Sequence, residues 1–303
     1  MKLQSGLYET DGYKCLGNLD NDNMDLRLMY CGYEDCAPGH RFGPNKRQAY
    51  VIHVIVKGRG KLEDEDGLWE MHAGDAFVLR PHEEAWYEAD HYDPWTYIWI
   101  GFQGMRAKEC VVNAGFDNNN QVIHNIDATK LQGYVTEMMK SPDLSYSNSL
   151  RRCAYLQMFL AELLEQYSGN VPGIEKVENE PASNHVKQLM AYLAEHYADK
   201  IRISEIADEM DINRSYLSNS FRKMTGSSPS DYLMKLRMEK ARSLLKKTNY
   251  PIGQIAGEVG YSDALAFSRQ FKRYFGQNPR QFRLEPDKLE IAKGKKNPEN
   301  VLL

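Results

Sequence analysis

One short pattern occurs twice near the end of this 303-residue chain, and this repeat constrains the fold more than any other feature. The first copy spans Ile203–Tyr232 and the second spans Ile252–Phe282. The equivalent pairs include Ile206/Ile255, Ala207/Ala256, Leu217/Phe267, Phe221/Phe271, Gly226/Gly276 and Pro229/Pro279. The offset rises from 49 to 50 in the middle of the copies, so one residue has been added within the second. Two similar substructures are therefore expected.

Each copy has the pattern of a helix, a tight turn and a second helix, because apolar residues recur every three or four positions on both sides of a polar break. The first turn is predicted at Asp211–Ile212, with Asn213 as N-cap of the next helix. The second is predicted at Gly260–Tyr261, with Ser262 as N-cap. Such a turn requires positive φ, which glycine adopts freely and aspartate at some cost. Two helix-turn-helix units are predicted.

The outward faces of the second helices predict a DNA interface, because a recognition helix lies in the major groove with its N-terminal half against base edges. Between the units, Pro229–Lys247 predicts one helix of about 27 Å, close to a DNA turn of about 34 Å. The predicted DNA-binding residues are Arg214, Ser215, Ser218, Asn219 and Arg222 in the first unit and Asp263, Ala264, Leu265, Ser268, Arg269 and Lys272 in the second.

Residues 184–284 resemble the DNA-binding domain of the AraC/XylS family of bacterial transcription regulators. The resemblance is carried by the run from Gly260 to Arg283, with its aromatic residues, Gly276 and Pro279. It departs from the family at Asp211, where a glycine is common, and at Ala264–Ala266, where some relatives have polar base-contacting side chains. These apolar side chains either contact thymine methyl groups or simply leave space beside the DNA. The base preference of the second unit therefore stays open.

Charge is distributed unevenly, which agrees with a nucleic-acid partner at one end of the chain. Residues 1–168 hold 16 Lys and Arg against 25 Asp and Glu, whereas residues 183–284 hold 17 against 10. Phosphate attracts the basic segment and repels the acidic one. We therefore expect double-stranded DNA to bind the C-terminal part.

In the N-terminal part of the chain, residues 1–125, short β-branched and aromatic runs alternate with Gly, Pro and charged turns. This pattern predicts an antiparallel sandwich or barrel. The runs are Tyr50–Val56, Lys61–Glu63, Trp69–Met71, Gly74–Leu79 and Trp95–Ile100. Their order resembles the cupin-like sensor domain of AraC-type regulators. A closer resemblance, to members that control carbohydrate-utilisation genes, is carried by Phe42–Pro44, Arg47, Tyr50, His53, Gly58–Gly60, Gly74–Asp75, Pro81, Tyr87 and Asp93–Phe102. That resemblance implies a sugar effector.

A barrel with aromatic and a few polar side chains suits a sugar, because rings stack on pyranose C–H faces while polar groups fix the hydroxyls. The predicted ligand-binding residues are Arg41, Arg47, His53, Tyr87, Tyr97 and Trp99. Strand alternation sends Trp95, Tyr97 and Trp99 to one face and Thr96, Ile98 and Ile100 to the other. The alternative is that Trp95, Trp99 and Phe102 belong to the barrel core.

An enzyme is the rival interpretation, because some cupins hold a metal with a His-x-His pair, a Glu and a later His. Here His53 has no partner two residues away, and the five cysteines lie outside any CxxC spacing. We therefore predict no catalytic residue, no metal and no cofactor. A regulator whose barrel binds no ligand is a further alternative.

After the barrel, residues 126–168 predict two helices, at Leu131–Met139 and Leu150–Tyr167. The second has more apolar surface than one contact face requires, and relatives pair two protomers here, so we expect a homodimer or packing on the chain's own barrel. Residues 169–183 predict a linker and residues 285–303 a disordered tail. The first helix of the DNA-binding domain is predicted at Asn184–Tyr197.

The predicted fold is therefore an α+β multidomain chain, with a cupin-like antiparallel barrel, a helical dimerisation region and an all-α double helix-turn-helix domain at 184–284. The predicted function is activation of carbohydrate-utilisation genes, controlled by a sugar such as an α-galactoside or another oligosaccharide. RNA polymerase is a further expected partner. No run of about 18 apolar residues and no signal-peptide pattern occurs, so a cytoplasmic protein without membrane contact is expected.

Overall fold

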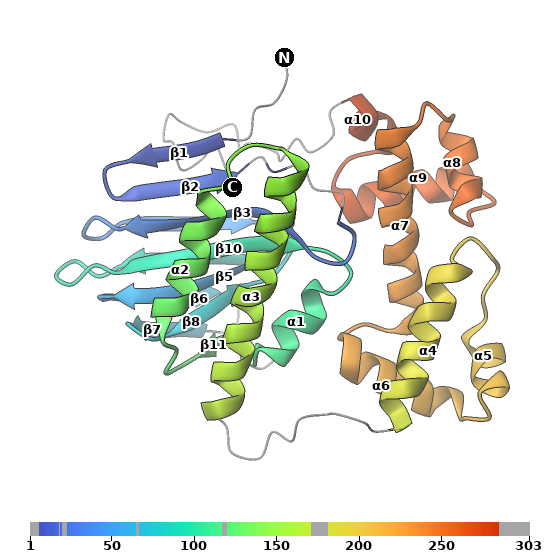
Figure 1. Cartoon of the computed structure of the whole chain (residues 1–303), viewed down its shortest axis with the longest axis horizontal. Helices are drawn as coiled ribbons and strands as arrows, with labels where there is room; N and C mark the ends of the chain where they lie inside the picture. Colours follow the sequence, from blue (N-terminus) through green and yellow to red (C-terminus); the bar gives the residue numbers. More distant parts are fainter. Residues whose placement is uncertain are drawn as a thin grey trace. The chain divides into compact units, whose positions relative to one another are not determined.

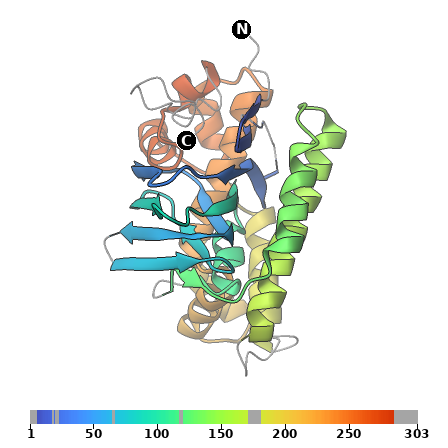
Figure 2. The same cartoon turned by 90° about the vertical axis from the view of Figure 1, so that its left-hand side faces the viewer.

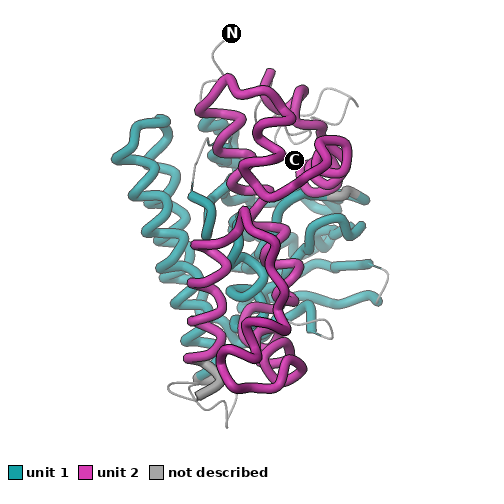
Figure 3. The backbone as a smooth tube through the Cα atoms, turned by 90° about the vertical axis from the view of Figure 1, so that its right-hand side faces the viewer, with its two compact units in different colours: residues 1–174, 289–303 teal, residues 175–288 magenta. Residues whose placement is uncertain are grey.

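The computed structural model describes residues 6–17, 19, 23–64, 67–116, 120–170 and 181–284. Two compact units are distinguished, one holding the described residues up to Asn170 and the other those from Pro181 to Leu284 (Figure 3). The first contains strands and helices, and the described part of the second contains helices alone, which confirms the predicted α+β class. The predicted tail and residues 171–180 of the predicted linker lie outside the described residues.

The strands of the first unit form two antiparallel sheets among the described residues. The large sheet has the order β1-β2-β3-β10-β5-β8-β11, and the small sheet has the order β4-β9-β6-β7. The strands are β1 (Gly6–Thr10), β2 (Tyr13–Gly17), β3 (Arg27–Asp35), β4 (Arg41–Lys46), β5 (Tyr50–Lys57), β6 (Arg59–Asp64), β7 (Gly67–His72), β8 (Ala76–Leu79), β9 (Glu84–Ala89), β10 (Thr96–Gln103) and β11 (Val122–Ile123). The antiparallel pairing agrees with the sequence prediction for this unit.

The central strands of the large sheet are buried on both faces, which explains the nearly continuous apolar runs of β5 and β10. Side chains alternate along a strand, so Ile55 and Trp99 join a core shared with the small sheet. Ile52 and Ile98 point the other way and join a second core, shared with helices. The first unit therefore has three layers: the small sheet, the large sheet and a helical layer.

The helical layer consists mainly of α2 (Ala128–Met139) and α3 (Tyr146–Asn170), which run along one face of the large sheet (Figures 1 and 2). Leu131 and Val135 of α2, with Leu156 and Phe159 of α3, are fully or almost fully buried there. A short helix, α1 (Ala107–Asn113), precedes them. Both long helices begin three or four residues before their predicted starts, and α3 ends at Asn170, inside the predicted linker.

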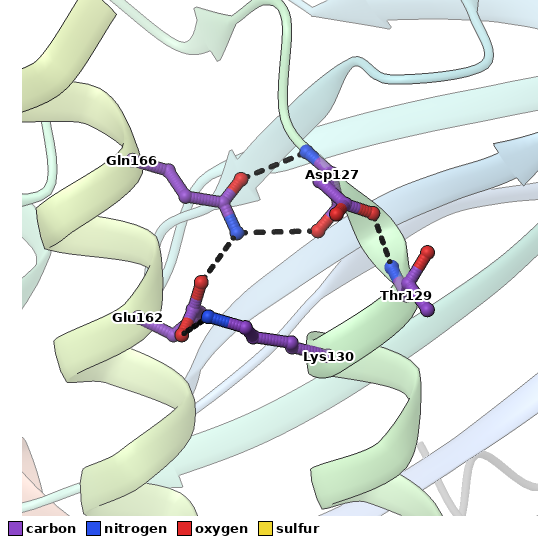
Figure 4. Close-up of polar contacts among 5 residues, drawn as sticks. All are labelled: Asp127, Thr129, Lys130, Glu162 and Gln166. Atoms are coloured by element: carbon purple, nitrogen blue, oxygen red, sulfur yellow. Dashed lines mark hydrogen bonds and ion pairs between the residues drawn. The ribbon is translucent and has the colours of Figure 1, made fainter.

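Polar contacts join the start of α2 to the last turns of α3 (Figure 4). Asp127 caps α2 by accepting from the Thr129 backbone N–H at 2.9 Å. Its own N–H donates to Gln166 Oε1 at 2.8 Å, and Gln166 Nε2 donates to the Asp127 carbonyl at 3.2 Å. Glu162 accepts from Gln166 at 3.0 Å and from Lys130 at 3.3 Å. These hydrogen bonds connect both helices to the chain segment that leaves β11.

The second unit has the predicted order of helices. They are α4 (Pro181–Glu195), α5 (Ile203–Glu209), α6 (Arg214–Thr225), α7 (Pro229–Lys247), α8 (Ile252–Glu258), α9 (Ala264–Phe275) and α10 (Pro279–Leu284). Leu217 and Phe221 of α6, and Phe267 and Phe271 of α9, are fully buried, as their spacing predicts. Within the described part of the chain, no helix has the length and apolar character needed to cross a membrane.

Candidate effector pocket and nucleic-acid interface

A small cavity lies in the core between the two sheets. Its walls include five of the six predicted ligand-binding residues: Arg47, His53, Tyr87, Tyr97 and Trp99. The central strands place them, because His53 of β5 lies opposite Trp99 of β10 in the strand pairing, and both face inward. The space inside is about 20 Å³, roughly room for one water molecule. The role of these residues in binding a sugar stays a prediction.

Two cavity side chains have buried nitrogen atoms without hydrogen-bond partners among the described residues. They are Arg47, through Nε and Nη2, and His53, through Nδ1. The Arg47 guanidinium carbon lies 4.9 Å from the centre of the Phe42 ring, a cation–π contact. Buried polar atoms are normally paired. The cavity therefore offers nitrogen atoms that a bound molecule can satisfy.

The His53 ring is surrounded by aromatic rings. It stacks on Phe77 with centroids 4.6 Å apart and an interplanar angle of 7°, and the Tyr97 ring meets it edge-on at 5.2 Å. Burial, and then the positive charge of Arg47, lower the pKa of His53 well below its ordinary value. His53 is therefore neutral at physiological pH.

Glu34 supplies a carboxylate to the same cavity, and the sequence analysis missed it. The Tyr97 hydroxyl donates to Glu34 Oε2 at 2.7 Å, and His40 Nε2 lies 3.5 Å from Glu34 Oε1. Burial raises the pKa of Tyr97 well above its ordinary value, so this hydroxyl remains a donor. One guanidinium and one carboxylate thus face a cavity whose other walls are aromatic rings, Val51 and the Cys15 thiol.

Tyr13 and Tyr30 also line the cavity and were missed. Tyr13, on β2, packs against Trp99 with ring centroids 5.7 Å apart, and burial raises the pKa of Tyr30 to about 12. The strands that carry them are short or interrupted by glycine and charge, so their sequences gave only a weak β signal. The alternation of Tyr30 and Gly32 with Glu34 along β3 is the pattern that marks one inward face.

Arg41 is not among the cavity-lining residues. Its guanidinium lies 3.9 Å from the centre of the Trp86 ring, its Nε is 3.9 Å from Glu88, and its side chain is 51% exposed. Arg41 precedes the inward-facing Phe42, so strand alternation turns it outward. The prediction that Arg41 binds ligand in the barrel therefore finds no support in the geometry.

The sequence left open whether Trp95, Trp99 and Phe102 line a pocket or belong to the core, and the structure separates them. Trp95 is fully buried in the core between the sheets but outside the cavity lining. Phe102 belongs to the core beneath the helices, because alternation along β10 places it on the same face as Ile98 and Ile100. Trp99, by contrast, lines the cavity. Among the described residues, no three His, Cys, Asp or Glu side chains are grouped as metal ligands.

The two recognition-type helices start from the predicted turns. Asp211 and Gly260 have φ angles of 54° and 79°, both in the left-handed region. Asn213 caps α6 by accepting from Ser215 N at 2.7 Å. The cap of α9 is Asp263, which accepts from Leu265 N at 2.8 Å, so the prediction of Ser262 was wrong by one residue. The added residue of the second copy moves the cap away from the turn.

None of the eleven predicted DNA-binding residues is buried in the structure. Nine are exposed, and Ser218 and Ser268 are half-buried, with Ser268 Oγ donating to the Ala264 carbonyl at 2.8 Å. Inside the unit, Arg242 donates to Glu239 at 3.0 Å, a buried pair that holds α7 to Tyr274 of α9. The side chains predicted to contact DNA are therefore accessible, and their contacts remain a prediction.

Comparisons with known proteins identify both units. The AraC-like ligand binding domain matches residues 27–140, and the family model described as a helix-turn-helix domain matches residues 206–285. The chain is 34% identical to the Msm operon regulatory protein of Streptococcus mutans, over 88% of this chain and 95% of that protein.

Two further relatives are similar over nearly their whole length. The raffinose operon transcriptional regulatory protein of Pediococcus pentosaceus is 29% identical, over 88% of this chain and 96% of its own. The lactose operon transcription activator of Staphylococcus xylosus is 27% identical, over 86% and 92%. The chain thus belongs to the AraC family of transcription regulators, with an AraC-like ligand-binding domain followed by a helix-turn-helix DNA-binding domain.

Proposed function

We propose that this regulator activates carbohydrate-utilisation genes when a neutral sugar occupies the cavity of the first unit. The observation that carries the proposal is the pair of buried, unpartnered donors and acceptors on Arg47 and His53, inside an aromatic wall. Sugars combine hydroxyl groups with apolar C–H faces, so they match both features. One guanidinium and one carboxylate at the cavity favour a ligand without net charge.

An oligosaccharide such as an α-galactoside is the class of effector we propose. Two relatives are named for raffinose and lactose operons, and another for the arabinose operon of Escherichia coli. The cavity volume of about 20 Å³ is far below that of a sugar site. Binding therefore requires the wall to open, and Phe42, on the edge strand β4 of the small sheet, is a wall residue with no strand outside it.

The first unit is proposed to act as a sensor and not as an enzyme. Besides the His53 imidazole, the described cavity lining offers one carboxylate, Glu34, whose Oε2 accepts from the Tyr97 hydroxyl. A metal-dependent reaction needs several imidazole or carboxylate ligands around one position. Metal analysis of the purified protein tests this, because stoichiometric metal would favour the enzymatic alternative.

A cytoplasmic homodimer is the proposed working form. Leu150, Ala154 and Met158 follow one another at four-residue spacing on α3 and are exposed, with Leu150 54% and Met158 46% accessible. An exposed apolar stripe on a long helix is suited to packing against the same helix of a second protomer. Sedimentation of the wild type and of Met158→Glu tests this: the variant should be monomeric. RNA polymerase is the proposed partner through which DNA-bound protein activates.

The sugar proposal is tested by thermal unfolding of the full chain in the presence of mono- and oligosaccharides. A ligand that binds only the folded state raises the temperature midpoint of unfolding. At a ligand concentration about a hundred times Kd, the folded state is stabilised by about 2.7 kcal/mol. Arg47→Ala should abolish the shift. Arg41→Ala is the matched control, because Arg41 lies outside the cavity, and it should keep the shift. The proposal fails if no sugar shifts the wild type, or if both arginine variants behave alike.

A further inference from the structure

The exposed start of α9 is apolar, which is unusual for a recognition-type helix. Leu265 is 73% exposed, and Ala264 before it is also exposed. Two residues later, Phe267 is fully buried, so the core of the unit is complete without Leu265. The described unit leaves this large apolar side chain uncovered, so it is available for contact with a partner.

The polar groups around Leu265 are engaged within the helix itself. Asp263 accepts from Leu265 N at 2.8 Å as the N-cap. Ser268 Oγ donates to the Ala264 carbonyl at 2.8 Å. Arg269, one turn after Leu265 and so on the same face, is exposed. The groove-facing surface of α9 therefore begins with a methyl-rich patch, and a cation follows it.

The first unit differs at the equivalent position. Ser215 corresponds to Leu265 at the offset of 50, and it is exposed on α6 beside Arg214 and Asn219. These three side chains can donate to or accept from base edges. The two units therefore present different chemistry from the same place in the same motif.

We propose that Leu265 reads the 5-methyl group of a thymine, so that the second unit selects A·T pairs by apolar contact while the first unit reads bases by hydrogen bonds. In the major groove, thymine alone carries this methyl group, and an apolar side chain is the group that recognises it. Arg269, on the same face, anchors the helix beside that base pair. The inference rests on DNA binding by the second unit and goes beyond it in naming the base and the residue that reads it.

The test starts with selection of binding sites by the full chain from a pool of randomised DNA duplexes. The wild type, Leu265→Ala and Leu265→Gln are compared, and Ser215→Ala is the matched control in the first unit. Both Leu265 variants should lose the preference for thymine at one position and keep the rest of the selected sequence. Ser215→Ala should keep that thymine and change a position in the other half of the site.

A second measurement removes the methyl group from the DNA. Replacing the identified thymine by deoxyuridine removes the methyl group and should weaken wild-type binding about fourfold, the loss expected when one methyl group is no longer buried. The same replacement should leave binding by Leu265→Ala unchanged. The proposal is overturned if Leu265→Ala and Leu265→Gln select the wild-type sequence, or if deoxyuridine has no effect at any selected thymine. If the wild type enriches no sequence, sequence-specific DNA binding fails first, and this inference fails with it.

Discussion

Asp211 and Gly260 occupy the same position in the two helix-turn-helix units, and both have left-handed backbone conformations, with φ of 54° and 79°. At Gly260 a Cβ atom would lie 2.6 Å from the Ala198 carbonyl oxygen and 2.9 Å from Arg237 Nη2. In the second turn, the left-handed conformation favours glycine and the lack of space for a Cβ atom requires it. In the first turn, aspartate adopts the same conformation at a cost in free energy.

Asp211→Gly should therefore stabilise the second unit, by about 0.5 kcal/mol, and Gly260→Ala should destabilise it by more than about 1 kcal/mol. The free energy of unfolding is measured by chemical denaturation of the full chain. Gly257→Ala, on the exposed face of α8 with nothing within 4 Å of the added Cβ, is the control for a glycine with room. It should be neutral or stabilising. Equal losses for both alanine variants would show that the turn geometry is not the cause.

Arg269→Ala and Lys272→Ala should have different effects on DNA binding. If Arg269 reads a base, its loss costs about 1–3 kcal/mol and relaxes the preference at one base pair. If Lys272 contacts phosphate, its loss weakens binding to all duplexes similarly and reduces the salt dependence by about one unit of slope. Binding to selected and scrambled duplexes at several salt concentrations separates the two effects. An unchanged selected sequence for Arg269→Ala would mean that α9 is placed wrongly on DNA.

His53 should make the stability of the first unit depend on pH. Its pKa is lowered in the folded protein from 6.5, so below pH 6.5 the unfolded chain takes up a proton that the folded chain does not. The contribution of neutral His53 to the free energy of unfolding is therefore fully present above pH 6.5. It is lost as the pH drops, by up to about 1.4 kcal/mol per pH unit, until the folded-state pKa is reached.

The measurement is chemical unfolding at pH 7.5 and 5.5 for the wild type and His53→Gln. The variant should show a smaller loss of stability between the two pH values, because its amide does not titrate. Identical losses would assign the pH dependence to other groups.

Removing one partner of the buried Glu239–Arg242 pair should destabilise the second unit more than replacing both partners by apolar residues. Arg242→Leu leaves the buried Glu239 without its guanidinium and should destabilise the second unit by about 3 kcal/mol. Arg242→Leu combined with Glu239→Leu should recover part of that loss, because no charge is then left buried. Denaturation of the three proteins measures the difference. A double variant less stable than Arg242→Leu would show that Glu239 has other indispensable contacts.

The helix-turn-helix repeat was predictable because each copy supports the other. Leu217 and Phe221 of α6 are fully buried, and so are Phe267 and Phe271, which follow them by 50 residues in α9. The sequence does not reveal that the N-cap of α9 is Asp263 and not the preceding residue. Ser262 and Asp263 are both good caps, and only the backbone conformation decides that Asp263 is the one that caps α9.

The cavity was predictable where a strand alternates regularly and unpredictable where registers shift. Tyr97 and Trp99 follow directly from alternation along β10. Gly32 could not be identified, because its role depends on pairing with Trp99: a Cβ there would lie 2.6 Å from the Trp99 ring. Arg41 and Arg47 look equivalent in sequence, but the register shift after Phe42 in β4 separates them, and Arg47 alone reaches the cavity.

The coupling between the cavity and DNA binding is tested most directly by the affinity of the full chain for its selected duplex. That affinity is measured with and without the sugar that raises the temperature midpoint of unfolding. A sugar that favours one arrangement of the DNA-binding units should change that affinity by about fivefold or more. Arg47→Ala should bind the same duplex with an affinity that the sugar does not alter. Equal wild-type affinities with and without a sugar that demonstrably binds would contradict the coupling between cavity and DNA.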